Sequence, residues 1–370
     1  MIAIGNGAKK EIDLQFAKVG TNIIIINAGK IDKSAIRIKQ TEKVTTLKLK
    51  DLTALTEQCP YIKDVSPSID GTFKTKANGL STMTLVYGVY PEYSKITNFP
   101  VEKGRYFTQE ENKLSRRVAV IGQEIRKNLF SNEDPIGKTI RIENTPFEII
   151  GVLIPKGASP DGANLDNKIL IPLKTAQRRV FNVNYLNQIY ISVLKQDQMH
   201  IAEKEIEYIL REQHRLEKRN KKNDFTINNQ LNAINAQKES IKMFNWLIAG
   251  VAGISLLVGG IGILAVMLLS VKDRTSEIGL RLSIGARKRD IIWQFLMEAL
   301  ILGLTGGMVG IVIGLFLSWF IDIATNWKTS VTFVSVLLSV GFSMAIGLIF
   351  GVFPARKAAR LDPVVALQKE

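Results

Sequence analysis

The chain has 370 residues, 46% hydrophobic and 22% charged, with a formal net charge of +15. Three uncharged runs, residues 243–271, 299–321 and 329–355, each exceed the roughly 20 apolar residues that cross a hydrocarbon core, which excludes a wholly soluble protein. Residues 1–242 carry 38 Lys/Arg and 27 Asp/Glu, which equally excludes a purely membranous one. Because the lysines are scattered rather than gathered in a stripe, we interpret the basic surplus as composition and expect no nucleic-acid partner.

The first 242 residues mix helical and strand patterns, which predicts an α+β domain. Asp51 is expected to cap a helix, and residues 143–146 to turn a hairpin between two strands. Helices are predicted over residues 8–19, 51–58, 123–130 and 201–219, and strands over residues 21–27, 80–90, 118–121, 139–142, 147–154 and 187–194.

No catalytic constellation emerges from this domain. Gly137-Lys138-Thr139 resembles the end of a phosphate-binding loop, but Asn132 stands where the first glycine belongs, and a predicted strand follows. His200 and His214, both on the predicted helix over residues 201–219 or at its edge, are interpreted as surface residues. Cys59 is the single cysteine, so no intrachain disulfide or cysteine-based metal cluster can form. We therefore expect no catalytic residue, no cofactor site and no metal site, and hence no enzyme activity in this chain.

The chain from residue 229 onward carries the membrane pattern. No proline occurs between Pro172 and Pro354, so one helix can run from about Asn229 through the first span to Leu269. Glycines recur at four-residue spacing inside the spans, which lets membrane helices pack closely; ordinary glycine richness of such helices is the alternative. The candidate packing positions are Gly259, Gly260, Gly303, Gly307, Gly310 and Gly314.

Basic residues predict the orientation of these spans. The loop 272–289 holds six Lys/Arg and the tail after Pro354 holds four, whereas the loop 322–328 holds one. The positive-inside rule makes the first loop and the C-terminus cytoplasmic, which leaves residues 1–242 outside. Four residues before Gly5 are too few for a signal peptide, so we expect a preceding transmembrane helix, with residues 1–4 as its last turn.

The cytoplasmic loop is too regular for a mere connector. Its sequence DRTSEIGLRLSIG, residues 273–285, places Ile278, Leu280 and Leu282 on a short amphipathic helix that ends at Gly285. Apolar side chains exposed on a polar loop predict a docking surface for a cytoplasmic partner. A helix that lies on the lipid interface is the alternative.

Four segments resemble the MacB-type permeases of the FtsX superfamily of ABC transporters, and the resemblance covers the whole chain. Two departures, Leu282-Ser283-Ile284 where many relatives have a Lys-Ala-Leu type triplet and Ala265 where they have Asn, bear on partner specificity. The four segments are VAVIGQEIRKNLFSNEDPIGKTIRI at 118–142, LLVGGIGIL at 256–264, VKDRTSEIGLRLSIGARKRDI at 271–291 and PARKAARLDPV at 354–364.

This resemblance implies a homodimeric type VII ABC transporter with four transmembrane helices. Residues 1–242 would form an extracytoplasmic core domain with stalk helices, composed of a porter-like part and a middle subdomain inserted at about 95–185. Residues 243–370 would form the permease domain in the inner or plasma membrane, with a coupling helix at about 273–285. ATP and Mg would bind a nucleotide-binding domain outside this chain, either fused or separate. The implied ATPase-coupling residues are Arg274, Glu277, Ile278, Gly279, Arg281, Leu282, Gly285 and Ala286.

The leading functional hypothesis is export of drugs, peptides or toxins by mechanotransmission, with a periplasmic adaptor and an outer-membrane channel as further partners. Release of lipoproteins, or regulation of a cell-wall hydrolase, is the alternative within the same fold. A membrane-anchored sensor without transport is an alternative from another class. On the leading hypothesis Ile278→Asp is expected to abolish contact with the ATPase, because it buries an unpaired carboxylate.

Overall fold

The computed structural model describes residues 7, 22–29, 45–131, 133–158, 164–217, 221–324 and 331–362. The predicted helix over residues 8–19 and the expected end of a membrane helix at residues 1–4 lie outside these ranges. Two compact units divide the chain between Ala236 and Gln237. We call the described part of Ile12–Ala236 the external unit and the described residues from Gln237 onward the membrane unit. The expected boundary at residue 242 stays a prediction.

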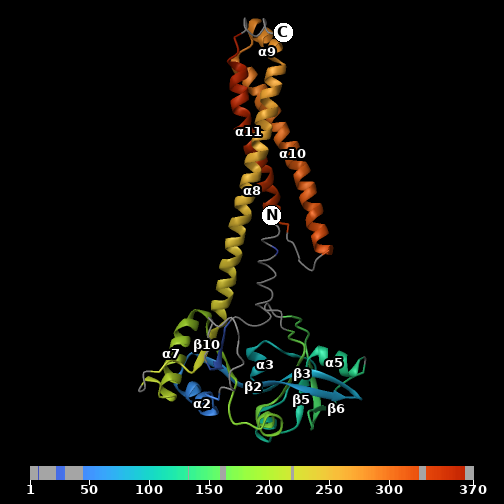
Figure 1. Ribbon diagram of the computed structural model, residues 1–370, viewed down its shortest axis with the longest axis vertical. Helices are drawn as coiled ribbons and strands as arrows, with labels where there is room; N and C mark the ends of the chain where they lie inside the picture. Colours follow the sequence, from blue (N-terminus) through green and yellow to red (C-terminus); the bar gives the residue numbers. More distant parts are fainter. Residues whose placement is uncertain are drawn as a thin grey trace. The chain divides into compact units, whose positions relative to one another are not determined.

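A mixed sheet organises the external unit (Figure 1). Its described strands run in the order β10-β1-β9-β2-β3-β8-β5-β7-β4, and β6 pairs with both β2 and β7. Neighbours are antiparallel except β3 with β8 and β5 with β7. The strands are β1 Ile23–Ala28, β2 Ile62–Ala77, β3 Leu80–Val89, β4 Val101–Gly104, β5 Val118–Ile121, β6 Thr139–Ile142, β7 Thr145–Leu153, β8 Lys168–Pro172, β9 Gln188–Val193 and β10 Phe225–Asn229.

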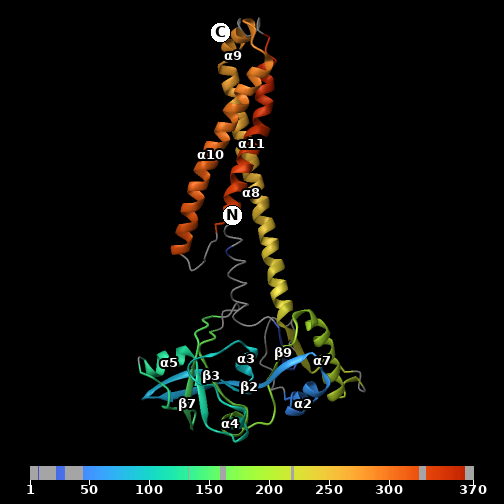
Figure 2. The ribbon, with the colours of Figure 1, turned by 180° about the vertical axis from the view of Figure 1, so that it is seen from behind.

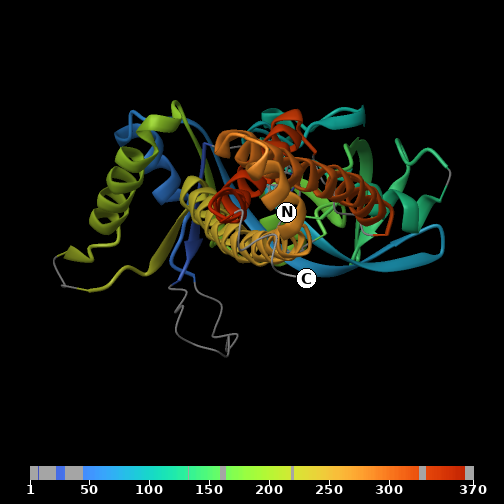
Figure 3. The ribbon, with the colours of Figure 1, turned by 90° about the horizontal axis from the view of Figure 1, so that it is seen from above.

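Helices gather at the two ends of this sheet. Helices α2 and α7 contact each other, and α7 also contacts β10, whereas α5 lies at the other end of the sheet and packs mainly on β3 (Figures 2 and 3). Shorter turns connect the strands between them. The described elements are α2 Leu49–Gln58, α3 Tyr93–Ile96, α4 Gln109–Lys113, α5 Gln123–Phe130, α6 Leu173–Thr175, the π-helical turn η1 Ala176–Phe181, the 3-10 turn η2 Gln196–Gln198 and α7 Met199–Gln213.

Both faces of the sheet are buried around its middle strands, which explains why β5 is a continuous apolar run. Val118 and Val120 face one cluster of apolar side chains, with Phe107, while Ala119 and Ile121 face another on the opposite side. Successive side chains of a strand point to opposite faces, so a strand covered on both sides needs no polar alternation.

Most of the predicted elements are confirmed, although several begin or end at other residues than predicted. Helix α2 is capped by Lys48, and Asp51 acts from inside the first turn: its Oδ2 accepts the Lys48 N–H at 2.7 Å. The hairpin turn is shorter than predicted, because Ile142 pairs with Thr145. Helix α7 ends at Gln213 rather than residue 219.

The 16-residue strand β2 was not predicted, although it pairs with β3, β6 and β9. Its sequence contains Pro67 and Gly71 and three lysines, which obscure the alternation on which strand prediction depends. The turn from β2 to β3 is Asn78-Gly79, both with positive φ, as a tight hairpin of this kind requires.

Three helices of the described chain are long and apolar enough to cross a membrane: α8 Gln230–Asp273, α10 Lys288–Ala324 and α11 Phe333–Ala359. Between 6% and 17% of their most apolar windows is buried, so most of these side chains are left for lipid or for partner helices. A short helix, α9 Thr275–Ser283, connects α8 to α10. Helix α8 begins directly after β10, in the external unit, and continues without a break into the membrane unit.

Candidate functional site

Helices α10 and α11 pack through small residues. A Cβ at Gly303 would lie 2.8 Å from the carbonyl oxygen of Ser343, and one at Gly347 would lie 2.9 Å from that of Ala299. A Cβ at Gly307 would lie 2.7 Å from Ser343 Oγ. These backbones therefore approach more closely than any side chain would permit, as small residues allow in membranes.

The other predicted packing glycines divide into two groups. Gly260 of α8 lies against the ring of Phe350 in α11, so a side chain there would collide with it. Gly259, Gly310 and Gly314 meet nothing within 4 Å among the described residues. The structure therefore places Gly260, with the α10 glycines named above, at contacts inside this chain, and leaves these three on open helix faces.

Helix α9 lies in a corner formed by the three long helices. Ile278 is 3% exposed and belongs to an apolar cluster in the membrane unit. Gly279 beside it is also buried. The cluster draws on all three long helices: Met267 and Val271 from α8, Ile291, Phe295 and Ala299 from α10, and Ala355, Ala358 and Ala359 from α11. Helix α9 is therefore packed against all three long helices at once.

Polar contacts hold α9 against α10. Arg281 donates to Gln294 Oε1 at 2.7 Å and pairs with Glu277 at 2.6 Å. Arg274 pairs with Glu298 at 3.1 Å. Because these ion pairs are partly exposed, each adds at most about 1 kcal/mol of stability, and their main effect is to hold the geometry.

Gly285 and Ala286 form the turn that ends α9. Gly285 has a φ of 98°, a conformation that glycine adopts without strain. Its N–H donates to Leu282 O at 3.2 Å, and the Ala286 N–H donates to Arg281 O at 3.0 Å, which satisfies carbonyls at the helix end. The chain then enters α10, where Asp290 Oδ2 accepts the Arg287 N–H at 3.2 Å.

Of the three apolar side chains that the sequence placed on this helix, only Leu280 is exposed. Ile278, which was expected to dock on the ATPase, is enclosed by the protein's own core, and Leu282 is half-buried against the same cluster. Leu280 and Ile284 are 54% and 79% exposed instead. The two pairs, each at i and i+4, lie on different sides of the helix, and the sequence alone could not tell which side faced inward. Consequently Ile278→Asp would disrupt the fold of the corner and does not test docking.

His214 corrects another expectation. His200 is a surface residue, as predicted, but the His214 side chain is only 8% exposed. Its Nδ1 lies 2.7 Å from Asp224 Oδ1, and its Nε2 lies 3.3 Å from Asp51 Oδ2. The Asp51 carboxylate beside it, aided by Asp224, outweighs burial and raises the His214 pKa to about 9. This buried ion-pair group connects α2, α7 and the start of β10.

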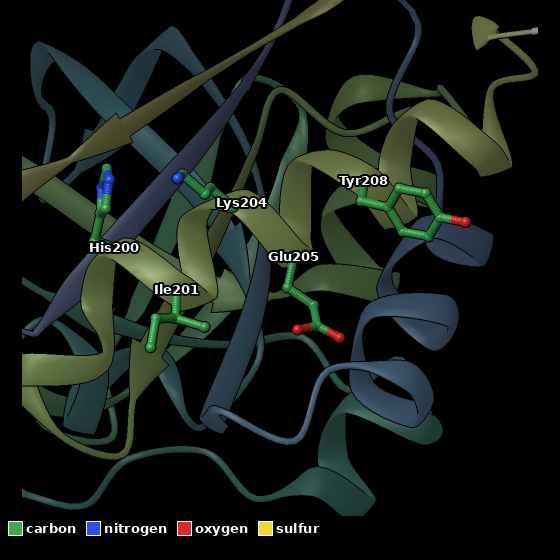
Figure 4. Close-up of a pocket in the computed structure, with 5 residues that line it drawn as sticks. All are labelled: His200, Ile201, Lys204, Glu205 and Tyr208. Atoms are coloured by element: carbon green, nitrogen blue, oxygen red, sulfur yellow. The ribbon is translucent and has the colours of Figure 1, made fainter.

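No catalytic arrangement is found among the described residues. No three His, Cys, Asp or Glu side chains lie close enough together to hold a metal ion in that part of the chain. A hollow on the outer face of α7 is lined by His200, Ile201, Lys204, Glu205 and Tyr208 (Figure 4). Its side chains offer no activated nucleophile with a base and an orienting group, the set that covalent catalysis requires.

The geometry can be compared with known proteins. Residues 1–209 match the model of the MacB-like periplasmic core domain, and residues 249–363 match that of the FtsX-like permease C-terminal domain. Over its whole length the chain is 36% identical to the macrolide export ATP-binding/permease protein MacB of Bdellovibrio bacteriovorus. It is 34% identical to the pyoverdine export ATP-binding/permease protein PvdT of Pseudomonas aeruginosa. The chain spans 57% and 54% of these two relatives.

A solved structure supports the fold of the external unit. The periplasmic region of MacB from Actinobacillus actinomycetemcomitans superposes with a TM-score of 0.51 at 23% identity. The match covers 63% of this chain and 98% of that one. At this identity the likeness establishes the fold of the external unit and nothing finer.

Proposed function

This chain belongs to the family that joins a MacB-like periplasmic core domain to an FtsX-like permease domain, and we propose that it drives export by mechanical transmission. In this proposal ATP and Mg bind a nucleotide-binding domain outside the chain, fused or separate, and the chain itself hydrolyses nothing. The relatives' names support such a domain, since they are ATP-binding/permease proteins of which this chain spans little more than half.

Helix α8 carries the proposal. It has 44 residues without a break, about 66 Å at the rise of an α-helix, or roughly twice the thickness of a hydrocarbon core. Its uncharged stretch starts at Met243, and Trp246 is 72% exposed, as is typical of aromatic residues at a membrane interface. The first 13 residues, Gln230–Lys242, would then lie outside the membrane.

The two ends of α8 fit a transmitting element. At one end α9 packs on α8, α10 and α11 through Ile278. Movement imposed on α9 by an ATPase would therefore displace α8. At the other end α8 follows strand β10 of the external sheet. Cargo would be moved by the external unit and need not pass between the spans, where a charged path would be costly.

The assembly proposed around the chain is a homodimer in the inner or plasma membrane. Residues 1–242 would lie outside and the C-terminus in the cytoplasm, because the basic loop that contains α9 is the side that the positive-inside rule retains. Gly310 and Gly314, which lie on an open face of α10, are suitable for close approach of a second membrane helix. A periplasmic adaptor and an outer-membrane channel would complete the export route.

We propose drugs, peptides or toxins as the cargo class. The two relatives described above are named for macrolide and pyoverdine export, which supports export of mid-sized organic molecules over release of lipoproteins or regulation of a cell-wall hydrolase. A sensor without transport would not need an ATPase.

The proposal is tested by breaking α8 outside the membrane. Ala236→Pro removes a backbone hydrogen bond and clashes with the preceding turn, at a cost of about 3 kcal/mol. With the ATPase present, we expect unchanged ATP hydrolysis but lost protection of cells against a panel of macrolides and peptides. Ala236→Ser is the matched control, since it keeps the helix. Full protection by the proline variant, at equal membrane levels, would reject transmission through α8.

A further inference from the structure

The first turn of α8 is held to the external unit by side-chain hydrogen bonds as well as by the backbone that joins it to β10. Asn229, the last residue of β10, is 6% exposed, and its side chain makes two contacts. Its Oδ1 accepts the Leu231 N–H at 3.0 Å, which caps the first turn of α8. Its Nδ2 donates to Glu203 Oε2 of α7 at 2.9 Å. One buried amide therefore connects the start of α8 at Gln230 to α7, which ends at Gln213.

Further contacts connect the preceding residues to α7. Asn223 donates to Glu207 Oε1 at 2.7 Å and accepts a hydrogen bond from Arg211. Asp224 accepts from or pairs with His214, just beyond the end of α7, at 2.7 Å. Glu203, Glu207, Arg211 and His214 are spaced by three or four residues, so they lie along one side of α7. This row of contacts runs beside β10 from before its first residue to its last.

The position of β10 in the sheet makes this row important. Among the described strands β10 pairs with β1 alone, over five residues from Phe225 to Asn229. A strand held on one side can be detached from its neighbour one hydrogen bond at a time when its end is pulled. Side-chain contacts to a second element oppose this, because α7 must then move with the strand.

We propose that Asn229 and Glu203 are positioning residues that anchor α8 to α7, so that movement of α8 displaces α7 together with β10. This inference rests on the proposed function, in which α8 transmits movement to the external unit. The anchor is charge-assisted and largely shielded from water, since Glu203 is 23% exposed, and such hydrogen bonds are stronger than neutral ones.

The test separates the anchor from the helix cap. Asn229→Asp keeps an oxygen for the Leu231 N–H, because Asp caps helices as well as Asn, but it turns a carboxylate toward Glu203. The double variant Asn229→Asp/Glu203→Gln restores the bond with the donor reversed. Asn232→Asp, the same change at an exposed position in the next residues of α8, is the matched control. Glu203→Ala, which leaves the cap intact, is a second variant should Asn229→Asp fail to fold.

Deuterium uptake of α7 is measured by mass spectrometry in the complete complex, with and without ATP turnover. We expect an ATP-dependent change in α7 uptake in the wild type and the control, its loss in Asn229→Asp and Glu203→Ala, and its return in the double variant. Loss of one hydrogen bond to a charged group corresponds to a factor of about ten in an equilibrium, so export per ATP should fall roughly tenfold in the single variants.

An ATP-dependent change in α7 that persists in Asn229→Asp overturns the anchor and leaves the proposed function intact. A wild type in which α7 does not respond to ATP overturns it as well. If the wild type exports none of the macrolides and peptides tested, the proposed function fails, but the uptake measurement still decides the anchor because it needs only ATP turnover.

Discussion

Two aspartates hold His214 in a charged state although most of its side chain is shielded from water. A buried imidazolium is stable only when its N–H groups are paired, and here each ring nitrogen faces a carboxylate, Asp51 on α2 and Asp224 at the start of β10. Phe225 lies edge to face with the ring at 5.9 Å. The group fastens α2 and the end of α7 to the strand that leads into α8.

This pairing predicts a pH dependence of stability. The His214 pKa is about 9 in the folded state against 6.5 in the unfolded chain, so its stabilisation is fully present below pH 6.5 and is lost as pH rises through 9. After allowance for solvent screening we expect roughly 1–2 kcal/mol. The thermal midpoints of the wild type and His214→Gln should therefore differ clearly at pH 6 and little at pH 9.5. An equal difference at both pH values would contradict the pairing.

At the cytoplasmic corner, exposure decides which residues can dock. Leu280→Asp removes an exposed apolar contact and would place a carboxylate in the interface, so we expect co-purification of the ATPase to fall at least tenfold, the effect of about 1.4 kcal/mol or more. The thermal stability of the chain should change little, because Leu280 is 54% exposed.

Ile278→Ala is the contrasting variant for this prediction. It empties part of the buried cluster and should cost about 2–5 kcal/mol of folding stability. If the ATPase co-purifies with Leu280→Asp as well as with the wild type, the docking surface does not lie on this side of α9.

At the scale of elements, the contact between α10 and α11 depends on a few glycines. Gly303→Ala adds a Cβ where the Ser343 carbonyl oxygen lies 2.8 Å away, and such overpacking costs about 1–3 kcal/mol. Gly306→Ala adds the same group on the same helix, where no described residue lies within 4 Å and where we propose no helix contact. The helix propensity gained is equal, so a lower thermal midpoint in detergent for Gly303→Ala alone isolates the contact. Equal midpoints would show that α10 and α11 do not pack at this position.

At the scale of the molecule, orientation is open to a direct measurement. Cys59 is 3% exposed, and burial raises its pKa, so the native thiol should react slowly and provide a silent background. We expect a membrane-impermeant maleimide to label Glu110→Cys in spheroplasts, and Arg287→Cys only after the membrane is permeabilised. Both positions are exposed in the structure. The reverse pattern would overturn the proposed topology.

The sequence alone determined the elements whose pattern is local. Uncharged runs indicated three spans, and each of the three long apolar helices contains all or most of one run. The proline-free stretch after Pro172 indicated the unbroken α8. A period of two or of 3.6 in the side chains, bounded by turn residues, is sufficient for such elements, and α5 was predicted over the residues that it occupies.

Only the tertiary structure decided what those patterns face. Ile278 and Leu280 are equally apolar and two residues apart, but α8, α10 and α11 enclose one and leave the other exposed. Likewise His214 resembles any histidine on a polar helix until Asp51, 163 residues earlier in the chain, is brought to 3.3 Å from it. Burial and pairing are properties of contacts between distant segments, so a local pattern that leaves two helix faces apolar, or a charge without its partner, cannot specify them.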